Sequence, residues 1–327
     1  MAAGKKILVI RLSSLGDVIY TTPVVRCLRQ QLPGAEIHFL TKEQFAPVYR
    51  NNPHLGKLLL LREKLGDTIA EIKSERYDYI VDLHNNLRTF LIKSRTGTAS
   101  FTYKKQPFRK WLSLKLRKNL MPDLHLVDRY LRAVKPLGIV NDNRPVDYPL
   151  NKSLSVASLL PEEFARDFVA FIIGAAHETK RMPNEKVAEI CAAINRPVVL
   201  LGGKDVFENG EKIRGEKGAH IFNGCGKFTL DESVFLTSKA TRILGFDTGL
   251  THIAEAFGRP IASIWGSTRP ELLGVMPYHV PEALVVGVDD LGCRPCSKYG
   301  LAKCPLGHFR CMWDIDNRQL IDFANAR

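Results

Sequence analysis

The sequence predicts an α/β protein with two domains, each built on a parallel sheet, that face a central cleft. At about 100–200 residues per domain, a chain of 327 residues holds two domains. Strand-like and helix-like segments alternate in both halves of the chain, which is typical of parallel sheets covered on both faces. A proline-rich, weakly patterned stretch at residues 141–161 separates the two halves and is interpreted as a linker.

The first half, residues 1–150, is predicted as one domain. Near-continuous runs of Ile, Val and Leu predict its parallel strands, at residues 6–12, 36–41, 58–61 and 77–83. Apolar residues at helical spacing predict a helix from Val18 to the stop at Pro33-Gly34, and shorter helices at 44–51 and 68–74.

Residues 151–315 are predicted as the second domain, and residues 316–327 as a terminal helix that returns toward the first domain. The same patterns predict strands at 168–173, 197–201, 219–222, 241–246 and 261–265. They predict helices at 184–194, 232–239, 250–257 and 316–326. Asp314 and Asp316 stand where the last helix needs a cap, so we interpret them as capping residues.

The positive charge is confined to the first half of the chain. The net charge is +13, and residues 1–150 carry all of it, with 26 basic and 13 acidic side chains. Residues 83–122 contain ten Lys or Arg and no acidic residue. Such asymmetry indicates an anionic partner for the first domain, with a solvated basic face as the alternative.

Several classes of protein are excluded by patterns that the sequence lacks. No apolar run approaches the roughly 20 residues of a membrane-spanning helix. The N-terminal apolar stretch is too short for a secretory signal, so we expect a cytoplasmic protein with reduced or metal-bound cysteines. No Gly-x-Gly-x-x-Gly fingerprint follows a strand, and no Walker A loop is present.

The loop that ends the first predicted strand carries a candidate catalytic carboxylate. Ser14, Gly16 and Asp17 lie between this strand and a helix, at the carboxyl edge of the sheet where ligands bind. A carboxylate at that edge can take a proton from an acceptor hydroxyl. The alternative is that Asp17 only caps the helix, which would also lower its pKa.

A second candidate loop follows the strand at 241–246. It runs Asp247-Thr248-Gly249-Leu250-Thr251-His252, where a glycine turn opens a helix. Unpaired backbone N–H groups at such a turn bind anions, and the hydroxyls and His252 add donors for a phosphate. The alternative is an Asp N-cap beside an incidental histidine.

Three further loops at the carboxyl ends of strands are candidates for the same site. Gly266 and Thr268 follow the strand at 261–265, in a small turn rich in hydroxyls. Lys180 or Arg181, after the strand at 168–173, offers a cation to a departing diphosphate, or is a solvated loop residue. Gly202 ends the strand at 197–201 and would let a flat ring lie on the backbone.

Four cysteines cluster near the C-terminus, with His308 among them. Cys293, Cys296, Cys304 and Cys311 lie within 19 residues and offer four soft ligands to a structural zinc ion. The first pair has knuckle spacing, whereas the second pair is wider. Free thiols and disulfides are the alternatives.

Two signatures resemble glycosyltransferase family 9, the family of ADP-heptose:lipopolysaccharide heptosyltransferases. The first is Ile10-Arg-Leu-Ser-Ser-Leu-Gly-Asp17, and the second runs from Asp247 to Ala254 and on through Gly258-Arg-Pro260 to Gly266-Ser-Thr268. Both occur in order at the expected spacing, and the similarity covers nearly the whole chain.

The resemblance implies a GT-B fold of two Rossmann-like domains, with the acceptor on the first and the sugar nucleotide on the second. It implies inverting transfer of heptose from ADP-heptose to the anionic lipopolysaccharide inner core on lipid A, with no cofactor required for catalysis. It also implies a peripheral enzyme on the cytoplasmic face of the inner membrane. The segment from Phe108 to Lys118 mixes Trp, Leu and cations as an interfacial helix does, with an ordinary core-packing helix as the alternative.

The resemblance also assigns roles to residues. Asp17 is similar to the catalytic base, and Lys180 to the cation that binds the leaving diphosphate. The other expected donor-binding residues are Gly202, Asp247, Thr248, Gly249, Leu250, His252, Gly266 and Thr268. The expected acceptor-binding residues are Ser14, Gly16, His84, Arg88 and Arg129.

Two alternatives stay open at this stage. One is a GT-B transferase that uses another nucleotide sugar for a different envelope glycan, because no residue selects adenine over uracil or guanine. The other is a basic nucleic-acid-binding protein with a four-cysteine zinc knuckle. That alternative leaves Asp17 and the Asp247 loop without a role, so we expect no nucleic-acid partner.

Overall fold

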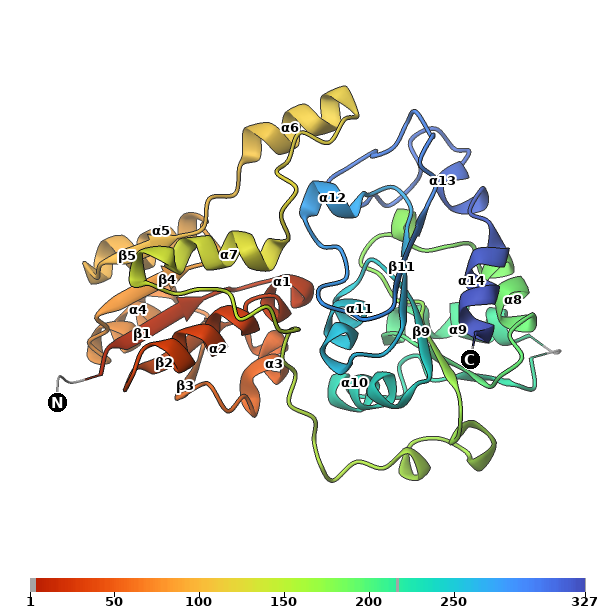
Figure 1. Ribbon diagram of the computed structural model, residues 1–327, viewed down its shortest axis with the longest axis horizontal. Coiled ribbons are helices and arrows are strands. Elements are labelled where there is room, and N and C mark those ends of the chain that lie inside the picture. Colours follow the sequence, from red (N-terminus) through yellow and green to blue (C-terminus); the bar gives the residue numbers. More distant parts are fainter. Residues whose placement is uncertain (1–3, 216–217, 327) are drawn as a thin grey trace. The chain divides into compact units, whose positions relative to one another are not determined.

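The computed structural model describes residues 4–215 and 218–326, and the chain divides into two compact units (Figure 1). The first unit holds the chain through Gln106 together with Leu124–Pro149. The second holds Pro107–Asp123 and the chain from Leu150 onward. The segment Pro107–Asp123 therefore groups with the second unit, although residues of the first unit flank it on both sides.

The first unit is built on a five-stranded parallel sheet in the order β3-β2-β1-β4-β5. The strands are β1 (Lys6–Ile10), β2 (Glu36–Thr41), β3 (Lys57–Leu60), β4 (Tyr79–Asp82) and β5 (Ser100–Thr102). In the centre of this sheet, Val9 of β1 pairs with Phe39 of β2 and with Val81 of β4. All four strands predicted for this half are confirmed, whereas the short edge strand β5 was not predicted.

Helices cover the first sheet. They are α1 (Leu15–Ile19), α2 (Thr22–Gln31), α3 (Pro47–Arg50), α4 (Leu65–Ser74), α5 (Leu87–Thr96) and α7 (Leu126–Val134). The single helix predicted from Val18 to residue 32 is wrong, because α1 and α2 are separate. The hydroxyls of Thr21 and Thr22 bond back to the carbonyls of Val18 and Ile19, and Pro23 supplies no N–H.

The second unit is built on a six-stranded parallel sheet in the order β11-β10-β9-β6-β7-β8. The strands are β6 (Val169–Ile172), β7 (Val198–Leu201), β8 (Ile221–Asn223), β9 (Arg242–Phe246), β10 (Ile261–Trp265) and β11 (Ala283–Gly287). The five strands predicted for this half are confirmed, and β11 was missed. The α/β class with two parallel sheets is thus confirmed.

Helices lie on both faces of the second sheet, with α8, α9 and α14 on one side and α10 and α11 on the other (Figure 1). The helices are α8 (Asn184–Ala192), α9 (Phe207–Arg214), α10 (Leu230–Lys239), α11 (Gly249–Ala254), α12 (Pro270–Leu273), α13 (Arg310–Trp313) and α14 (Asn317–Asn325). The unit also contains α6 (Pro107–Leu116). Among the described residues, no helix combines the length and the apolar character needed to cross a membrane.

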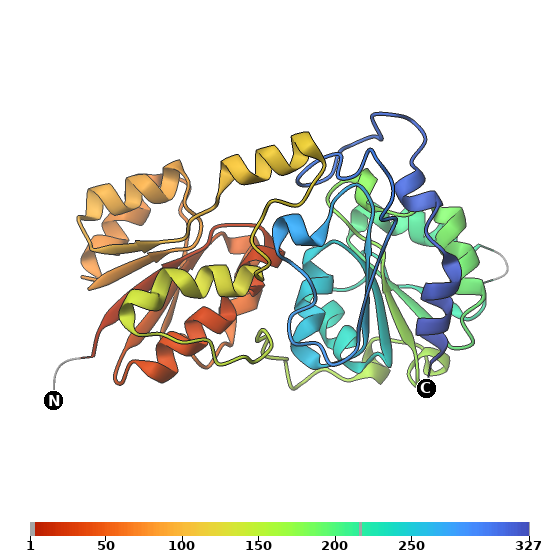
Figure 2. The ribbon, with the colours of Figure 1, turned by 45° about the horizontal axis from the view of Figure 1, so that its top comes forward.

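The terminal helix α14 begins at a cap that Asp316 supplies, as predicted. The capping of α14 predicted for Asp314 is wrong, because Asp314 ends α13 and pairs with Arg310. Asp316 accepts a hydrogen bond from the backbone N–H of Arg318 at 2.9 Å. The buried residues Leu320 and Phe323 join the core of the second unit, where α14 packs against α8 (Figure 2). Its return toward the first unit stays a prediction.

Candidate active site

Both candidate carboxylates lie just beyond the ends of interior strands. Asp17 lies in the first turn of α1, which follows β1, and Asp247 lies in the loop after β9; each of these strands has a partner on both sides. Because all the strands of each sheet are parallel, their carboxyl ends share one edge. The loop after β4 therefore lies beside the loop after β1, which brings His84 into the neighbourhood of Asp17.

Asp17 combines the capping role and the exposed position that the sequence left as alternatives. One carboxylate oxygen, Oδ2, accepts hydrogen bonds from the N–H and the hydroxyl of Ser14, at 3.2 and 2.9 Å. The same oxygen forms an ion pair with Nη2 of Arg11 at 2.8 Å. The other oxygen, Oδ1, receives a long contact of 3.4 Å from the hydroxyl of Tyr130. The side chain is 30% exposed, so a ligand can reach it.

Arg11 keeps Asp17 ionised. Burial alone would raise the pKa of Asp17, but the Arg11 guanidinium and the Ser14 hydrogen bonds outweigh burial and lower it. Arg11 is itself fixed, because its Nε donates to the carbonyl of Ser13 at 2.7 Å and its Nη1 to that of Leu83 at 2.6 Å. The Arg11 guanidinium also lies 5.6 Å from the ring centre of Tyr130.

The expected acceptor-binding residues His84, Arg88 and Arg129 differ in burial and in how close they lie to Asp17. Burial and the cations of Arg11 and Lys105 lower the pKa of His84 to about 4, so its ring is neutral at pH 7. Arg129 is buried on α7, where it bonds to Tyr103. Arg88 is exposed in the first turn of α5. The structure thus groups His84 with Asp17, while Arg88 faces solvent.

Asp247 is buried and surrounded by donors. Its Oδ2 receives Nζ of Lys180 at 2.5 Å and the hydroxyl of Thr268 at 3.2 Å. Its Oδ1 lies 3.4 Å from Nε2 of His252. Burial alone would raise the pKa of this carboxyl, but His252 and Lys180 lower it. The structure therefore brings three predicted residues together around the carboxylate of Asp247, which is only 7% exposed.

His252 is held between two carboxylates. Its Nδ1 lies 3.1 Å from Oε1 of Glu255, opposite the contact of Nε2 with Asp247. Burial would lower the pKa of His252, but hydrogen bonds to Asp247 and Glu255 raise it to about 9. At pH 7 the site therefore holds two cations, Lys180 and His252. Glu255 is fixed in turn by the backbone N–H of Tyr278, at 3.0 Å from its Oε2.

The predicted glycines of this unit are required by close packing. A Cβ on Gly202 would stand 2.5 Å from Val206, and a Cβ on Gly266 would stand 2.8 Å from the carbonyl oxygen of Thr179. Thr248 and Gly249 are half-buried at the start of α11, and Leu250 is buried. Gly202 and Gly266 thus serve to bring the loops close together, whether or not a ligand also contacts them.

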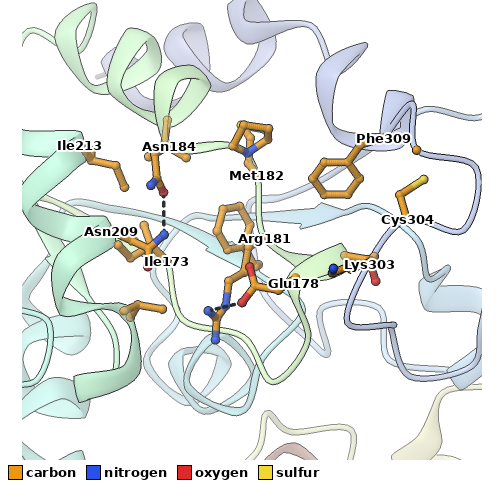
Figure 3. A pocket seen from close by; sticks show the side chains of 16 residues that line it. Ile173, Glu178, Arg181, Met182, Asn184, Asn209, Ile213, Lys303, Cys304 and Phe309 are labelled. Atoms are coloured by element: carbon orange, nitrogen blue, oxygen red, sulfur yellow. Dashed lines mark hydrogen bonds and ion pairs between the residues drawn. The ribbon is translucent and has the colours of Figure 1, made fainter.

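A cavity of about 510 Å³ in the second unit is lined in part by Thr179, Arg181 and Phe246, the sequence neighbours of Lys180 and Asp247 (Figure 3). Its walls include Met182, Phe309 and Ile213, and the amide of Asn209 donates to that of Asn184 at 3.0 Å. Of the predicted candidates, its lining contains Cys304 and Arg181, the alternative cation, whereas neither Lys180 nor Asp247 belongs to it. Lys180 and Asp247 thus lie outside this mostly apolar space.

The structural zinc site is not supported. All four late cysteines are free thiols, and the described residues contain no group of three or more His, Cys, Asp or Glu that could hold a metal ion. Burial raises the pKa of Cys296 to about 11 and that of Cys311 to about 12. The zinc-knuckle alternative loses its basis here.

Three contributors to the sites were not found from the sequence. Arg11 lies inside the first signature, but no spacing rule pairs it with Asp17. Tyr130 comes from α7, more than 100 residues along the chain. Glu255 could have been predicted from the sequence, because residues three apart in a helical segment lie on the same face and Glu255 follows His252 by three residues.

Comparisons with known proteins identify the family of the chain. A model described as glycosyltransferase family 9 (heptosyltransferase) matches residues 66–305. The chain is 25% identical over 291 residues to lipopolysaccharide heptosyltransferase 1 of Campylobacter coli, covering 80% of this chain and 84% of that protein. It is also 25% identical over 358 residues to lipopolysaccharide heptosyltransferase 2 of Escherichia coli strain K12, covering 98% of each.

A solved structure of an enzyme with a similar name has a similar fold. The solved structure of the E. coli ADP-heptose lps heptosyltransferase II has a TM-score of 0.73 at 21% identity, with 98% of both chains covered. This likeness confirms the GT-B class of two Rossmann-like units. Because the family model matches far more than half of its residues, the chain belongs to glycosyltransferase family 9 and is a glycosyltransferase.

Proposed function

We propose that the chain transfers heptose from ADP-heptose to the lipopolysaccharide inner core, with inversion at the anomeric carbon. The family match carries this proposal, and the names of the relatives supply the donor and acceptor. The excess of basic residues in the first half supports an anionic acceptor. It also supports a peripheral position on the cytoplasmic face of the inner membrane, where such an acceptor is anchored.

Asp17 is the proposed general base. Its carboxylate is ionised and partly exposed, and among the described contacts Oδ1 carries only the long bond from Tyr130. That oxygen takes the proton of the acceptor hydroxyl as the hydroxyl oxygen bonds to the anomeric carbon. Arg11 and Ser14 hold the other oxygen and so fix the direction in which Oδ1 points.

The cluster around Asp247 is the proposed site for the donor diphosphate. Lys180 and His252 place two positive charges at the carboxyl edge of the second sheet. The bond between the diphosphate oxygen and the anomeric carbon breaks as the acceptor oxygen bonds to that carbon. The diphosphate then leaves with additional negative charge. Cations and backbone N–H groups already in place stabilise that charge without reorganisation. The half-buried turn at Thr248 and Gly249 supplies such N–H groups.

The test is a transfer assay with purified chain, ADP-heptose and a lipopolysaccharide core acceptor that lacks the heptose. Mass spectrometry of the acceptor should show one added heptosyl residue, and NMR should show the inverted anomer. ADP, UDP and GDP are compared in parallel by thermal shift, and ADP should stabilise the chain most. Transfer from a UDP- or GDP-sugar alone would instead establish the alternative donor.

A further inference from the structure

Exposed apolar side chains gather on α6 and the segment that follows it. Of the large hydrophobic side chains exposed in the described structure, four lie between residues 108 and 120, and two more, Leu87 and Phe90, lie three residues apart on α5. The first four are Phe108, Trp111, Leu116 and Leu120, exposed by 69%, 53%, 52% and 37%. Contiguous apolar surface of this kind marks a contact with a partner or a membrane.

The helix presents Phe108 and Trp111 on one face. Phe108, Trp111 and Lys115 are spaced by three and four residues and so lie on the same side, whereas the buried Lys110 and Ser113 lie on the opposite side. The rings of Phe108 and Trp111 are stacked at 6.0 Å, and Nζ of Lys115 lies 5.2 Å from the centre of the Trp111 ring. The outward face is therefore an aromatic pair with a cation beside it.

Charge selects the partner. Residues 83–122 contain no acidic side chain, and Arg109, Lys115 and Lys118 are exposed on or next to α6. An apolar face surrounded by cations matches an anionic lipid surface, in which aromatic rings sit at headgroup depth and cations meet phosphates. With 10 residues, α6 is long enough to lie in that surface and too short to cross a bilayer.

We propose that α6 docks the enzyme on an anionic bilayer, with Phe108 and Trp111 inserted at headgroup depth. This proposal rests on the proposed function, because a lipid-anchored acceptor requires the enzyme to work at the membrane surface. It predicts binding that needs both lipid charge and the aromatic pair. Each exposed cation is expected to contribute about fivefold in affinity near an anionic surface.

The experiment is co-sedimentation of the full chain with vesicles of phosphatidylcholine, alone or with added phosphatidylglycerol. Binding is expected only with the anionic lipid and should weaken with salt, because surface charges are screened. Phe108→Ser/Trp111→Ser should weaken binding at least about tenfold. A matched control is Val140→Ser/Leu306→Ser, which removes two equally exposed apolar side chains from elsewhere and should leave binding unchanged.

Fluorescence gives a second readout. Trp265 is fully buried and Trp313 is half-exposed, so a Trp313→Phe background leaves Trp111 as the exposed tryptophan. Its emission should shift to the blue with anionic vesicles and should be quenched by brominated lipid. No shift would overturn the proposal, as would equal binding to both vesicle types or full binding by the Phe108→Ser/Trp111→Ser variant.

The outcomes also separate this proposal from others. If vesicles do not bind but the chain self-associates through α6, as judged by loss of the oligomer in the double variant, the face is a contact between copies and the proposal fails. Transfer to a deacylated, water-soluble acceptor should be unaffected by the double variant. Vesicle binding without any heptosyl transfer would refute the proposed function and leave the docking intact.

Discussion

The two charged clusters each follow an interior strand of a parallel sheet, yet their carboxylates differ in exposure and in charged neighbours. Around Asp17, one buried cation and one capping serine hold a carboxylate that remains 30% exposed. Around Asp247, two cations and a hydroxyl surround a carboxylate that is 7% exposed. The first carboxylate can accept a proton from a ligand, whereas the second organises positive charge. A shared strand-to-helix topology therefore does not fix the chemistry of the loop, and the neighbouring side chains do.

The largest expected effect comes from Asp17→Asn, which removes the base and nearly preserves shape. Turnover should fall by about 10²- to 10⁴-fold, the typical contribution of general base catalysis. Nucleotide binding by the second unit should be unchanged in calorimetry. Asp67→Asn is the matched control, because Asp67 also lies in the first turn of a helix in the same unit and is exposed. A turnover within threefold of the unmodified chain would remove Asp17 from the mechanism.

Lys180→Ala tests the second cluster. It removes one of two cations and leaves the buried carboxylate of Asp247 with His252 and Thr268. We expect donor affinity to fall about 10- to 100-fold, because a charge-assisted bond to phosphate is worth roughly 1.5–3 kcal/mol. Calorimetric titration with ADP measures this change in affinity. Lys239→Ala, at an exposed lysine of the same unit, should have no effect, and equal affinities for the two variants would contradict the assignment.

Glu255→Gln separates the cationic state of His252 from its position. The raised pKa of His252 stabilises the folded chain below pH 6.5, and that stabilisation is lost as pH rises toward about 9. The loss amounts to at most about 3 kcal/mol. Denaturant unfolding between pH 6.5 and 9 should show this decline, and Glu255→Gln should reduce it. Glu271→Gln, at an exposed glutamate, is the control, and an unchanged slope in Glu255→Gln would show that Glu255 does not maintain the charge.

The smallest effect is expected for Tyr130→Phe, which deletes the long hydroxyl contact to Oδ1 of Asp17. Loss of a donor to the carboxylate should raise the pKa of Asp17 slightly and move the acid limb of the pH–rate profile upward. Turnover should fall by less than about tenfold. Tyr49→Phe removes a buried hydroxyl that bonds to Thr21 instead, so it should leave the acid limb in place. A shift of equal size in both variants would point to a general loss of packing.

Sequence patterns were sufficient for most of the fold. Runs such as Val198–Leu201 are buried at every position, and their continuous apolar character identified the strands. The edge strands β5 and β11 were missed, because their burial is partial and their pattern weak. Helix α9 was missed for a similar reason, since Gly210 and several charged residues dilute its apolar face. In the sites, the loops and most of their polar residues were predicted, but their bonding was not.

One tripeptide that occurs twice shows what a local sequence pattern cannot predict. Leu-Gly-Asp opens α1 at residues 15–17 and α4 at residues 65–67, and the aspartate takes the third helical position in both. The sequence by itself determined that each aspartate starts a helix, because that preference depends on local backbone geometry and on the helix dipole. Only the tertiary structure set Asp17 apart, by bringing Arg11 from the preceding strand and Tyr130 from a distant helix against it. Electrostatic interactions depend on distance in space rather than along the chain, so a local pattern cannot specify them.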